Sequence, residues 1–231
     1  MNNNSMLGAL YPYMGNQNMA NQTASKPSVA DALATSIAQK VSESLAAKEA
    51  FFNQNADQLV AAAQIIADAY SRNNKLLCAG NGGSSCDAAH LAVEFMHPVT
   101  AGRPALPAIN LSQDTTMASA VANDVGFEHV LTRQLIALSN ADDVLVVFTT
   151  SGNSANLIKA CKKAQSLGLK VIAFAGGDGG ALVSEGCTDI CLAVDTDSIH
   201  RIQECHLTAY HILWDLVHTL LADQRGSLQT S

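Results

Sequence analysis

The sequence predicts an α/β fold with a single doubly wound parallel sheet flanked by helices on both faces, similar to the flavodoxin fold. Short apolar segments alternate with helical segments along most of the chain, as they do in such folds. The segment DVLVVFTT, at 143–150, is almost uniformly apolar, as a strand buried on both faces must be. Two of the apolar segments end in loops rich in glycine or hydroxyl side chains. Such loops are typical of the sheet edge where these folds bind ligands.

The N-terminal part is expected to lie outside the sheet. Residues 1–28 are rich in Asn, Gln and Met without any period, which predicts a disordered tail before a single domain over 29–231. Apolar residues at helical spacing follow up to residue 74. They predict two helices broken near Asn53–Asn55. We expect this helical lead-in to pack against a neighbouring subunit.

The remaining elements alternate. Strands are expected at 75–80, 107–112, 143–150, 169–176 and 189–194. Helices are expected over DAAHLAVEFM, 114–140, SANLIKACKKAQSLG, a short piece before 189, and 199–223. Strands joined by helical crossovers run parallel, so the pattern gives one wrapped sheet.

Composition excludes several classes of protein. The 231 residues are 48% hydrophobic with a net charge of −7, which excludes a wholly disordered chain and disfavours nucleic acid or anionic membrane as a partner. No run approaches the roughly 20 apolar residues of a membrane span, and the first residues do not resemble a secretory signal. Six scattered cysteines without a CxxC pair are typical of reduced thiols. We therefore expect a cytoplasmic protein.

The two loops favour a phosphate group as ligand. GNGGSS (80–85) and TTSGNS (149–154) each join a strand to a helix, where free N–H groups and hydroxyls can bind an anion. Neither completes a dinucleotide or Walker fingerprint, and no GxSxG elbow marks a catalytic serine. The alternatives are a plain turn for the first loop and, for Ser154, the role of an N-cap alone.

Two polar pairs have helical spacing. His90 and Glu94 lie four apart, and Gln203 and His211 lie eight apart, so each pair shares a helix face. Alone, each pair is more often an ordinary helix surface than a metal site. Spacing does not show whether the two helices meet.

Together these motifs resemble the phosphosugar isomerase (SIS) family, and more narrowly its sedoheptulose 7-phosphate (phosphoheptose) isomerases. The resemblance spans about residues 30–222 and rests on GNGGSS…DAAHLAVE, AVANDVGF, TTSGNSANLIKA and RIQECHLTAYH. It implies a homotetramer with active sites at subunit interfaces. It also implies an aldose–ketose isomerase that makes D-glycero-D-manno-heptose 7-phosphate for ADP- or GDP-heptose and lipopolysaccharide or surface glycans.

The resemblance also implies the site. One Zn²⁺ per subunit would be bound by His90, Glu94, Gln203 and His211, and Glu94 and His211 would act as the acid/base pair through an enediol. The implied substrate-binding residues are Asn81, Gly82, Gly83, Ser84, Asp87, Glu94, Asn123, Asp124, Thr149, Thr150, Ser151, Ser154 and Gln203. For Asp87 the alternative is an ordinary acid in the first part of a helix, and for Asn123–Asp124 an ordinary turn.

Two rival functions share these features. A non-catalytic SIS protein that binds the replication initiator would have the fold and both loops, but it would lack the glutamate and final histidine that stand here as Glu94 and His211. An isomerase of, or sensor for, another phosphosugar would keep the phosphate loop without needing both pairs. The family pattern also differs at Thr149, where serine is common, at His200, and in HPVTAGRPALPA (97–108). These differences bear on the identity of the substrate.

Overall fold

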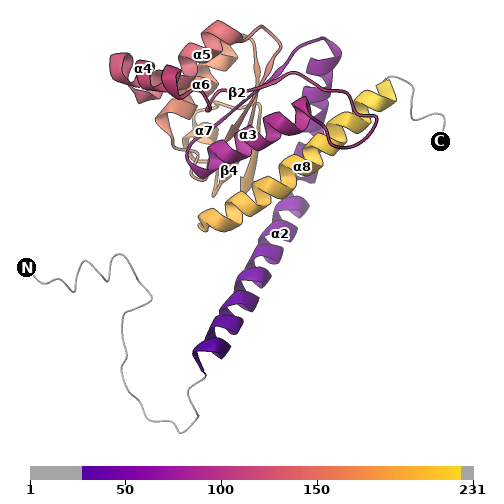
Figure 1. Ribbon diagram of the computed structural model, residues 1–231, viewed down its shortest axis with the longest axis vertical. Helices are drawn as coiled ribbons and strands as arrows, with labels where there is room; N and C mark the ends of the chain where they lie inside the picture. The colour runs from indigo at the N-terminus through magenta and orange to yellow at the C-terminus, as the bar shows by residue number, and fades with distance from the viewer. Residues whose placement is uncertain (1–27, 225–231) are drawn as a thin grey trace, which may run out of the picture. The chain divides into compact units, whose positions relative to one another are not determined.

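The computed structural model describes residues 28–224 and contains one sheet of five parallel strands with helices on both faces (Figure 1). The expected tail lies outside the described residues, apart from Ser28. The strands are β1 Leu76–Gly80, β2 Ala108–Asn110, β3 Val144–Phe148, β4 Lys170–Gly176 and β5 Ile190–Val194. The predicted doubly wound α/β fold is confirmed.

The strand order, β2-β1-β3-β4-β5, reverses direction beside β1. Leu76 at the start of β1 pairs with Ala108 of β2 on one side and Val144 of β3 on the other. The chain therefore leaves β1 in one direction and later returns to its other side. The carboxyl ends of β1 and β3 lie next to each other at this switch point, where ligands bind in open α/β sheets.

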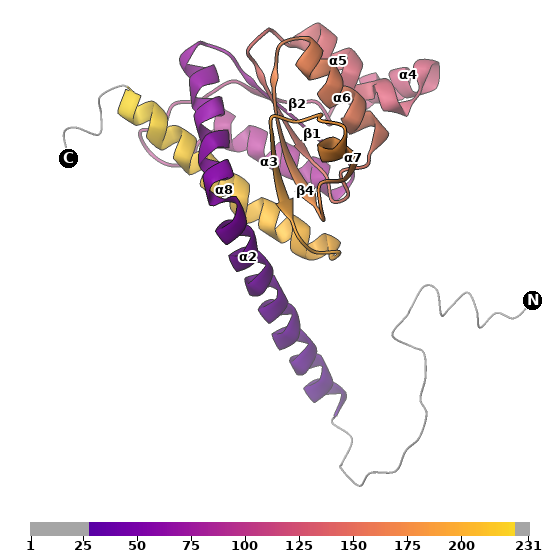
Figure 2. The same ribbon diagram turned by 180° about the vertical axis from the view of Figure 1, so that it is seen from behind.

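Helices cover the two faces of the sheet in separate groups (Figures 1 and 2). One buried core lies under α3, α8 and the part of α2 from Phe51 onward; the other lies under α4, α5, α6 and α7. Successive strand residues alternate between the two cores, as the pleat requires. The helices are α2 Val29–Ser71, α3 Gly83–Met96, α4 Thr115–Val125, the 3₁₀ helix η2 Phe127–His129, α5 Val130–Leu138, α6 Ala155–Ser166, α7 Gly180–Ser184 and α8 Ile199–Gln224.

The predicted break near Asn53–Asn55 is wrong, because α2 continues without interruption from Val29 to Ser71. Asn55 is buried, and its side-chain amide donates to the carbonyl of Phe51 one turn earlier, at 2.9 Å. It also donates to the carbonyl of Ala193 on β5, at 3.4 Å. With both partners inside the fold, this asparagine stabilises the helix at a position where it would otherwise favour a turn.

The chain divides into two compact units, residues 1–39 and 40–231. In the first, the described residues are helical from Val29 and expose Val29, Leu33 and Ile37. In the second, Val41 and Leu45 are also four residues apart and exposed. The three side chains of the first unit, called the apolar row below, are 60% to 79% accessible.

The expected helical stretch 114–140 is divided at Gly126. This glycine has φ +104°, a value that residues with a side chain rarely adopt, and it separates α4 from η2 and α5. Within the described part of the chain, no helix combines the length and the apolar content that a membrane span needs.

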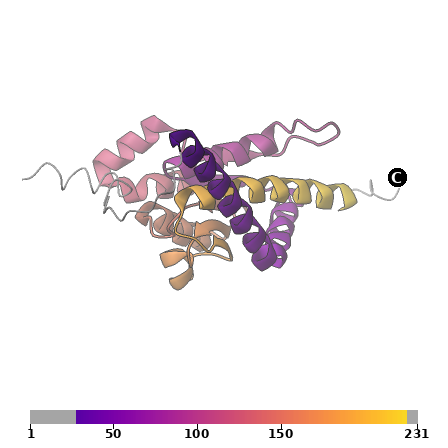
Figure 3. The same ribbon diagram turned by 90° about the horizontal axis from the view of Figure 1, so that it is seen from below.

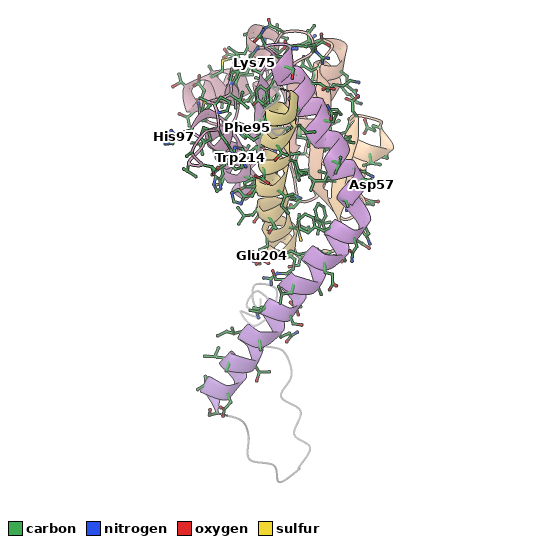
Figure 4. The ribbon with its side chains drawn as sticks, turned by 90° about the vertical axis from the view of Figure 1, so that its right-hand side faces the viewer. Asp57, Lys75, Phe95, His97, Glu204 and Trp214 are labelled. Atoms are coloured by element: carbon green, nitrogen blue, oxygen red, sulfur yellow. The ribbon has the colours of Figure 1, made fainter. Side chains whose placement is uncertain are left out.

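The amino ends of β1 and β3 are fastened by one buried carboxylate. Asp143 is fully buried and accepts from the backbone N–H of Lys75 at 2.9 Å and from its ammonium group at 2.6 Å. Lys75, labelled in Figure 4, follows α2 and directly precedes β1. The carboxylate thus fixes the two strands whose other ends carry the phosphate-type loops.

His206, on α8, is a buried core histidine. Its Nε2–H donates to the carbonyl of Ala175 on β4 at 3.1 Å, and its side chain is fully buried. Burial lowers the pKa of His206 from 6.5 to about 4. The ring is therefore neutral in the folded protein at neutral pH.

We predict that His206 makes the free energy of unfolding decrease at acidic pH. As the pH falls from 6.5 towards 4, His206 is protonated in the unfolded chain but stays neutral in the folded chain. The free energy of unfolding therefore decreases. One such group contributes up to about 1.4 kcal/mol per pH unit in that range. Urea unfolding between those pH values should show a shallower decline for His206→Gln than for the wild type. His200→Gln, at an exposed position on the same helix, is the control. Equal slopes for the wild type and His206→Gln would contradict the assignment.

Candidate active site

The two phosphate-type loops meet at the switch point of the sheet. They enclose a cavity of about 70 Å³ at the carboxyl ends of β1 and β3. It is lined by Asn81, Ser84, Phe148, Thr149, Thr150, Ser151, Ser154 and Leu157. None of these residues is charged, so an anion here would be bound by hydroxyl and N–H groups.

The second loop holds its shape through internal hydrogen bonds. The hydroxyl oxygen of Thr149 accepts from the backbone N–H of Gly152 at 3.1 Å. Gly152 has φ +67°, and a Cβ at this position would lie 2.0 Å from the carbonyl oxygen of Gly179. Only glycine fits, because a side chain would collide with backbone. Thr149 therefore shapes the loop in addition to lining the cavity.

Ser154 occupies the N-cap position of α6 but makes no side-chain capping hydrogen bond. The residue lines the cavity. The first N–H groups of any helix lack partners within the helix and favour anions. The beginning of α6 thus adds backbone donors to the hydroxyls of Thr150 and Ser151, which suits a phosphate group.

A pair of side-chain amides locks the two loops together. Asn81 donates to Asn156 at 2.9 Å, and Asn156 donates back to Asn81 at 2.8 Å. Asn156 is only 3% accessible. The side-chain nitrogen and the side-chain oxygen of Asn81 each make one hydrogen bond within the protein. The sequence did not predict a role for Asn156, because its position is typical of an ordinary residue in the first turn of a helix.

Helices α3 and α8 pack side by side and run in the same direction (Figures 1 and 3). Near the start of both, a Cβ added at Gly83 would lie 2.5 Å from the amide nitrogen of Gln203. Farther along, the indole N–H of Trp214 donates to the carbonyl of Glu94 at 2.9 Å. Trp214 and Phe95, both labelled in Figure 4, each pack against the ring of His218 on α8. The first two contacts each join residues 120 apart, so the two helices keep one alignment along this length.

This alignment brings together three of the four predicted metal ligands. Potential ligand atoms of His90, Glu94 and His211 all lie within 4.8 Å of one another. Nε2 of His90 is 3.1 Å from a carboxylate oxygen of Glu94, and the rings of His90 and His211 are 4.9 Å apart at 82°. Two imidazole nitrogens and one carboxylate oxygen form a set typical of catalytic zinc, which keeps a further position for substrate or water.

The electrostatics of this cluster suit a metal ion. Desolvation, followed by the neighbouring His90, lowers the pKa of His211, while Glu94 opposes the shift. Metal ligation requires the neutral imidazole, so a lowered pKa favours the binding form. The three residues present therefore fit zinc.

The other predicted residues occupy different places. Gln203 lies against Gly83, near the start of α3, and its membership of the ligand set stays a prediction. Asp87 is half-buried on α3, and burial raises its pKa to about 6. Asn123 and Asp124 lie in the last turn of α4, hydrogen-bonded to each other and exposed, outside the residues that line the loop cavity. A sugar contact by this pair stays a prediction.

Comparisons with known proteins agree with this architecture. A family model described as the SIS domain matches residues 39–176. The chain is 44% identical over 177 residues to the phosphoheptose isomerase of Chlorobaculum tepidum, covering 75% of this chain and 84% of that protein. It is 42% identical over 182 residues to the phosphoheptose isomerase of Aquifex aeolicus, covering 79% and 94% respectively.

Solved structures extend the likeness to the fold. The phosphoheptose isomerase of Francisella tularensis has a TM-score of 0.74 at 36% identity, covering 80% of this chain and 97% of that one. The enzyme of Neisseria gonorrhoeae has a TM-score of 0.75 at 36% identity, with coverages of 81% and 99%. The chain therefore belongs to the SIS-domain family, and within it to the phosphoheptose isomerases.

We predict that Asn156→Asp destabilises the protein by about 2–4 kcal/mol, because a buried carboxylate would face the amide oxygen of Asn81 without a proton to share. Urea unfolding at neutral pH measures the loss. Asn140→Asp makes the same change at an exposed position and should alter stability by less than about 0.5 kcal/mol. Equal stability of the two variants would show that the amide pair does not fasten the loops.

Proposed function

We propose that this chain is an aldose–ketose isomerase that converts sedoheptulose 7-phosphate into D-glycero-D-manno-heptose 7-phosphate through an enediol intermediate. Its relatives are phosphoheptose isomerases by name. The observation that carries the proposal is that α3 begins at the phosphate-type loop and bears, farther along, His90 and Glu94, which cluster with His211 of α8.

The spacing along α3 suits a linear sugar phosphate. Ser84 lines the loop cavity, and His90 lies six residues later, which is about 9 Å along a helix. A phosphate held by the hydroxyls of Thr150, Ser151 and Ser154 would leave the opposite end of an extended sugar at that distance. The neutral lining of the cavity accepts the phosphate through N–H and O–H donors.

Isomerisation requires a proton to leave C1 and a proton to return at C2. We assign Glu94 as the base at one carbon and His211 as its acid–base partner. Glu94 has two carboxylate oxygens, so one can ligate the metal while the other takes a proton. If one ring nitrogen of His211 held the metal, the other ring nitrogen would carry the proton.

Zinc is the proposed cofactor, one ion per subunit, held by His90, Glu94 and His211 with Gln203 as the fourth proposed ligand. When bound, it supplies Lewis-acid chemistry at the carbonyl group of the sugar. Glu94 and His90 also orient each other through their 3.1 Å contact. The remaining proposed contacts, among them Asp87, Asn123 and Asp124, would bind the hydroxyls of the sugar.

We propose a cytoplasmic homotetramer whose active sites lie at subunit interfaces and whose product feeds ADP- or GDP-heptose synthesis. The apolar row on α2 supports the association of subunits. Its three side chains repeat every four residues and are more than half exposed, and rows of this spacing are the ridges that pack between helices. A second copy of the chain would remove this apolar area from water.

An isomerase assay on the purified protein tests the proposal. Sedoheptulose 7-phosphate should be converted in the presence of zinc, and conversion should stop after chelation and resume when zinc is restored. Glu94→Gln should lower kcat at least about 100-fold, because the base is lost, while the protein still binds the substrate.

Glu185→Gln is the matched control, since it alters an exposed carboxylate paired with Lys162 at 2.6 Å. Its kcat should equal that of the wild type. A Glu94→Gln variant with near wild-type turnover would remove Glu94 from the role of base. No conversion by the wild type with or without zinc would contradict the proposed function.

A further inference from the structure

A tyrosine hydroxyl contacts the back of the first histidine in the metal cluster. The Oη atom of Tyr210, on α8, lies 2.7 Å from Nδ1 of His90, on α3. The opposite nitrogen of the same ring, Nε2, faces Glu94. Tyr210 is only 1% accessible, and its ring packs edge-on against His90 and Phe148. Both nitrogens of His90 are therefore engaged, one by a carboxylate and the other by a hydroxyl.

This pairing restricts the proton on the neutral ring. Nε2 faces a carboxylate, which only accepts, so in the metal-free protein Nε2 carries the proton and donates it. Nδ1 then has a lone pair and accepts from the hydroxyl of Tyr210. A metal on Nε2 would require the proton to lie on Nδ1, and the tyrosine oxygen can accept it. A hydroxyl is suited to both states because it both donates and accepts.

Asp87 supplies a further partner for the hydroxyl. It lies one turn before His90 on α3, and its Oδ2 atom is buried without a hydrogen-bond partner among the residues that the structure describes. Asp87 is also close enough to Tyr210 for its charge to raise the tyrosine pKa, although burial is the larger cause of that shift. When Tyr210 accepts from His90, its own proton can turn towards this carboxylate.

We propose that Tyr210 is a positioning residue that fixes the ring orientation of His90, donating to Nδ1 in the metal-free protein and accepting from it when Nε2 binds the metal. The second half of this inference rests on the proposed zinc site; the first half does not. In the switch between the two states one proton leaves Nε2 and one is bound at Nδ1, so the ring stays neutral.

The test compares Tyr210→Phe with Tyr70→Phe. Both changes remove one hydroxyl from a buried tyrosine, and the hydroxyl of Tyr70 donates to the carbonyl of Pro107 at 3.3 Å. Nitrogen NMR of the histidine rings, in metal-free protein at about pH 8, reports the tautomer of neutral His90. Its signal is assigned by its loss in His90→Gln. We expect the Nε2–H form in all three proteins, because Glu94 faces Nε2 in each. The Nδ1 resonance should move in Tyr210→Phe, which loses the hydrogen bond at that nitrogen, and should stay unchanged in Tyr70→Phe.

Zinc affinity, measured by competition with a chromophoric chelator, is the second readout. Tyr210→Phe should bind zinc about 10- to 100-fold more weakly than the wild type, the usual loss when a partner of a metal-bound histidine is removed. Tyr70→Phe should stay within about twofold. His90→Gln gives the background from other groups. An unchanged Nδ1 resonance together with an unchanged affinity in Tyr210→Phe would overturn the inference.

The two readouts separate this inference from the proposed function. Wild-type protein that binds no more zinc than His90→Gln would contradict the metal site, and the comparison of Nδ1 resonances alone would then decide the role of Tyr210. If Tyr210→Phe does not fold, the wild-type spectrum is decisive. A His90 ring protonated on Nδ1 in metal-free wild type would overturn the inference.

Discussion

The candidate active site depends on the parallel packing of α3 against α8. Contacts at Gly83–Gln203 and Glu94–Trp214 keep one alignment over about three turns of helix. A shift of α8 by a single turn would carry its side chains about 5 Å along the axis, beyond the separation within which the ligand atoms of His90, Glu94 and His211 now lie. The interaction between the two helices therefore decides whether the chain has a metal site.

The same helix connects this cluster to the sheet. α3 begins directly after β1, at the switch point, where the loop after β3 provides hydroxyls and helix N–H groups. Asp143 holds β1 and β3 together at their amino ends, and the Asn81–Asn156 pair holds their loops together at the other end. Phosphate binding and proton transfer would thus occur on one rigid unit. Pre-organisation of this kind lets binding energy from the phosphate orient the reacting carbons.

Much of this could be predicted from sequence, and two of the failures share a cause. Strands and loops were predicted correctly because apolar runs and glycine- or hydroxyl-rich turns are local signals. The continuity of α2 was not predicted, because the side chain of Asn55 donates a hydrogen bond to the carbonyl of Ala193, which lies 138 residues away along the chain. The clustering of His90 with His211 required knowledge of how two helices align. Asn156 was missed for the same reason, since its only distinguishing feature is a partner on another loop.

Diffraction from zinc-loaded crystals, with data collected at the zinc absorption edge, tests the central claim most directly. One anomalous peak per subunit should lie within about 2.2 Å of a ring nitrogen of His90, a ring nitrogen of His211 and a carboxylate oxygen of Glu94. The nitrogen of His90 should be Nε2, with Nδ1 still in contact with Tyr210. A peak at the cysteines, or crystals of zinc-activated enzyme without a peak between α3 and α8, would contradict the account.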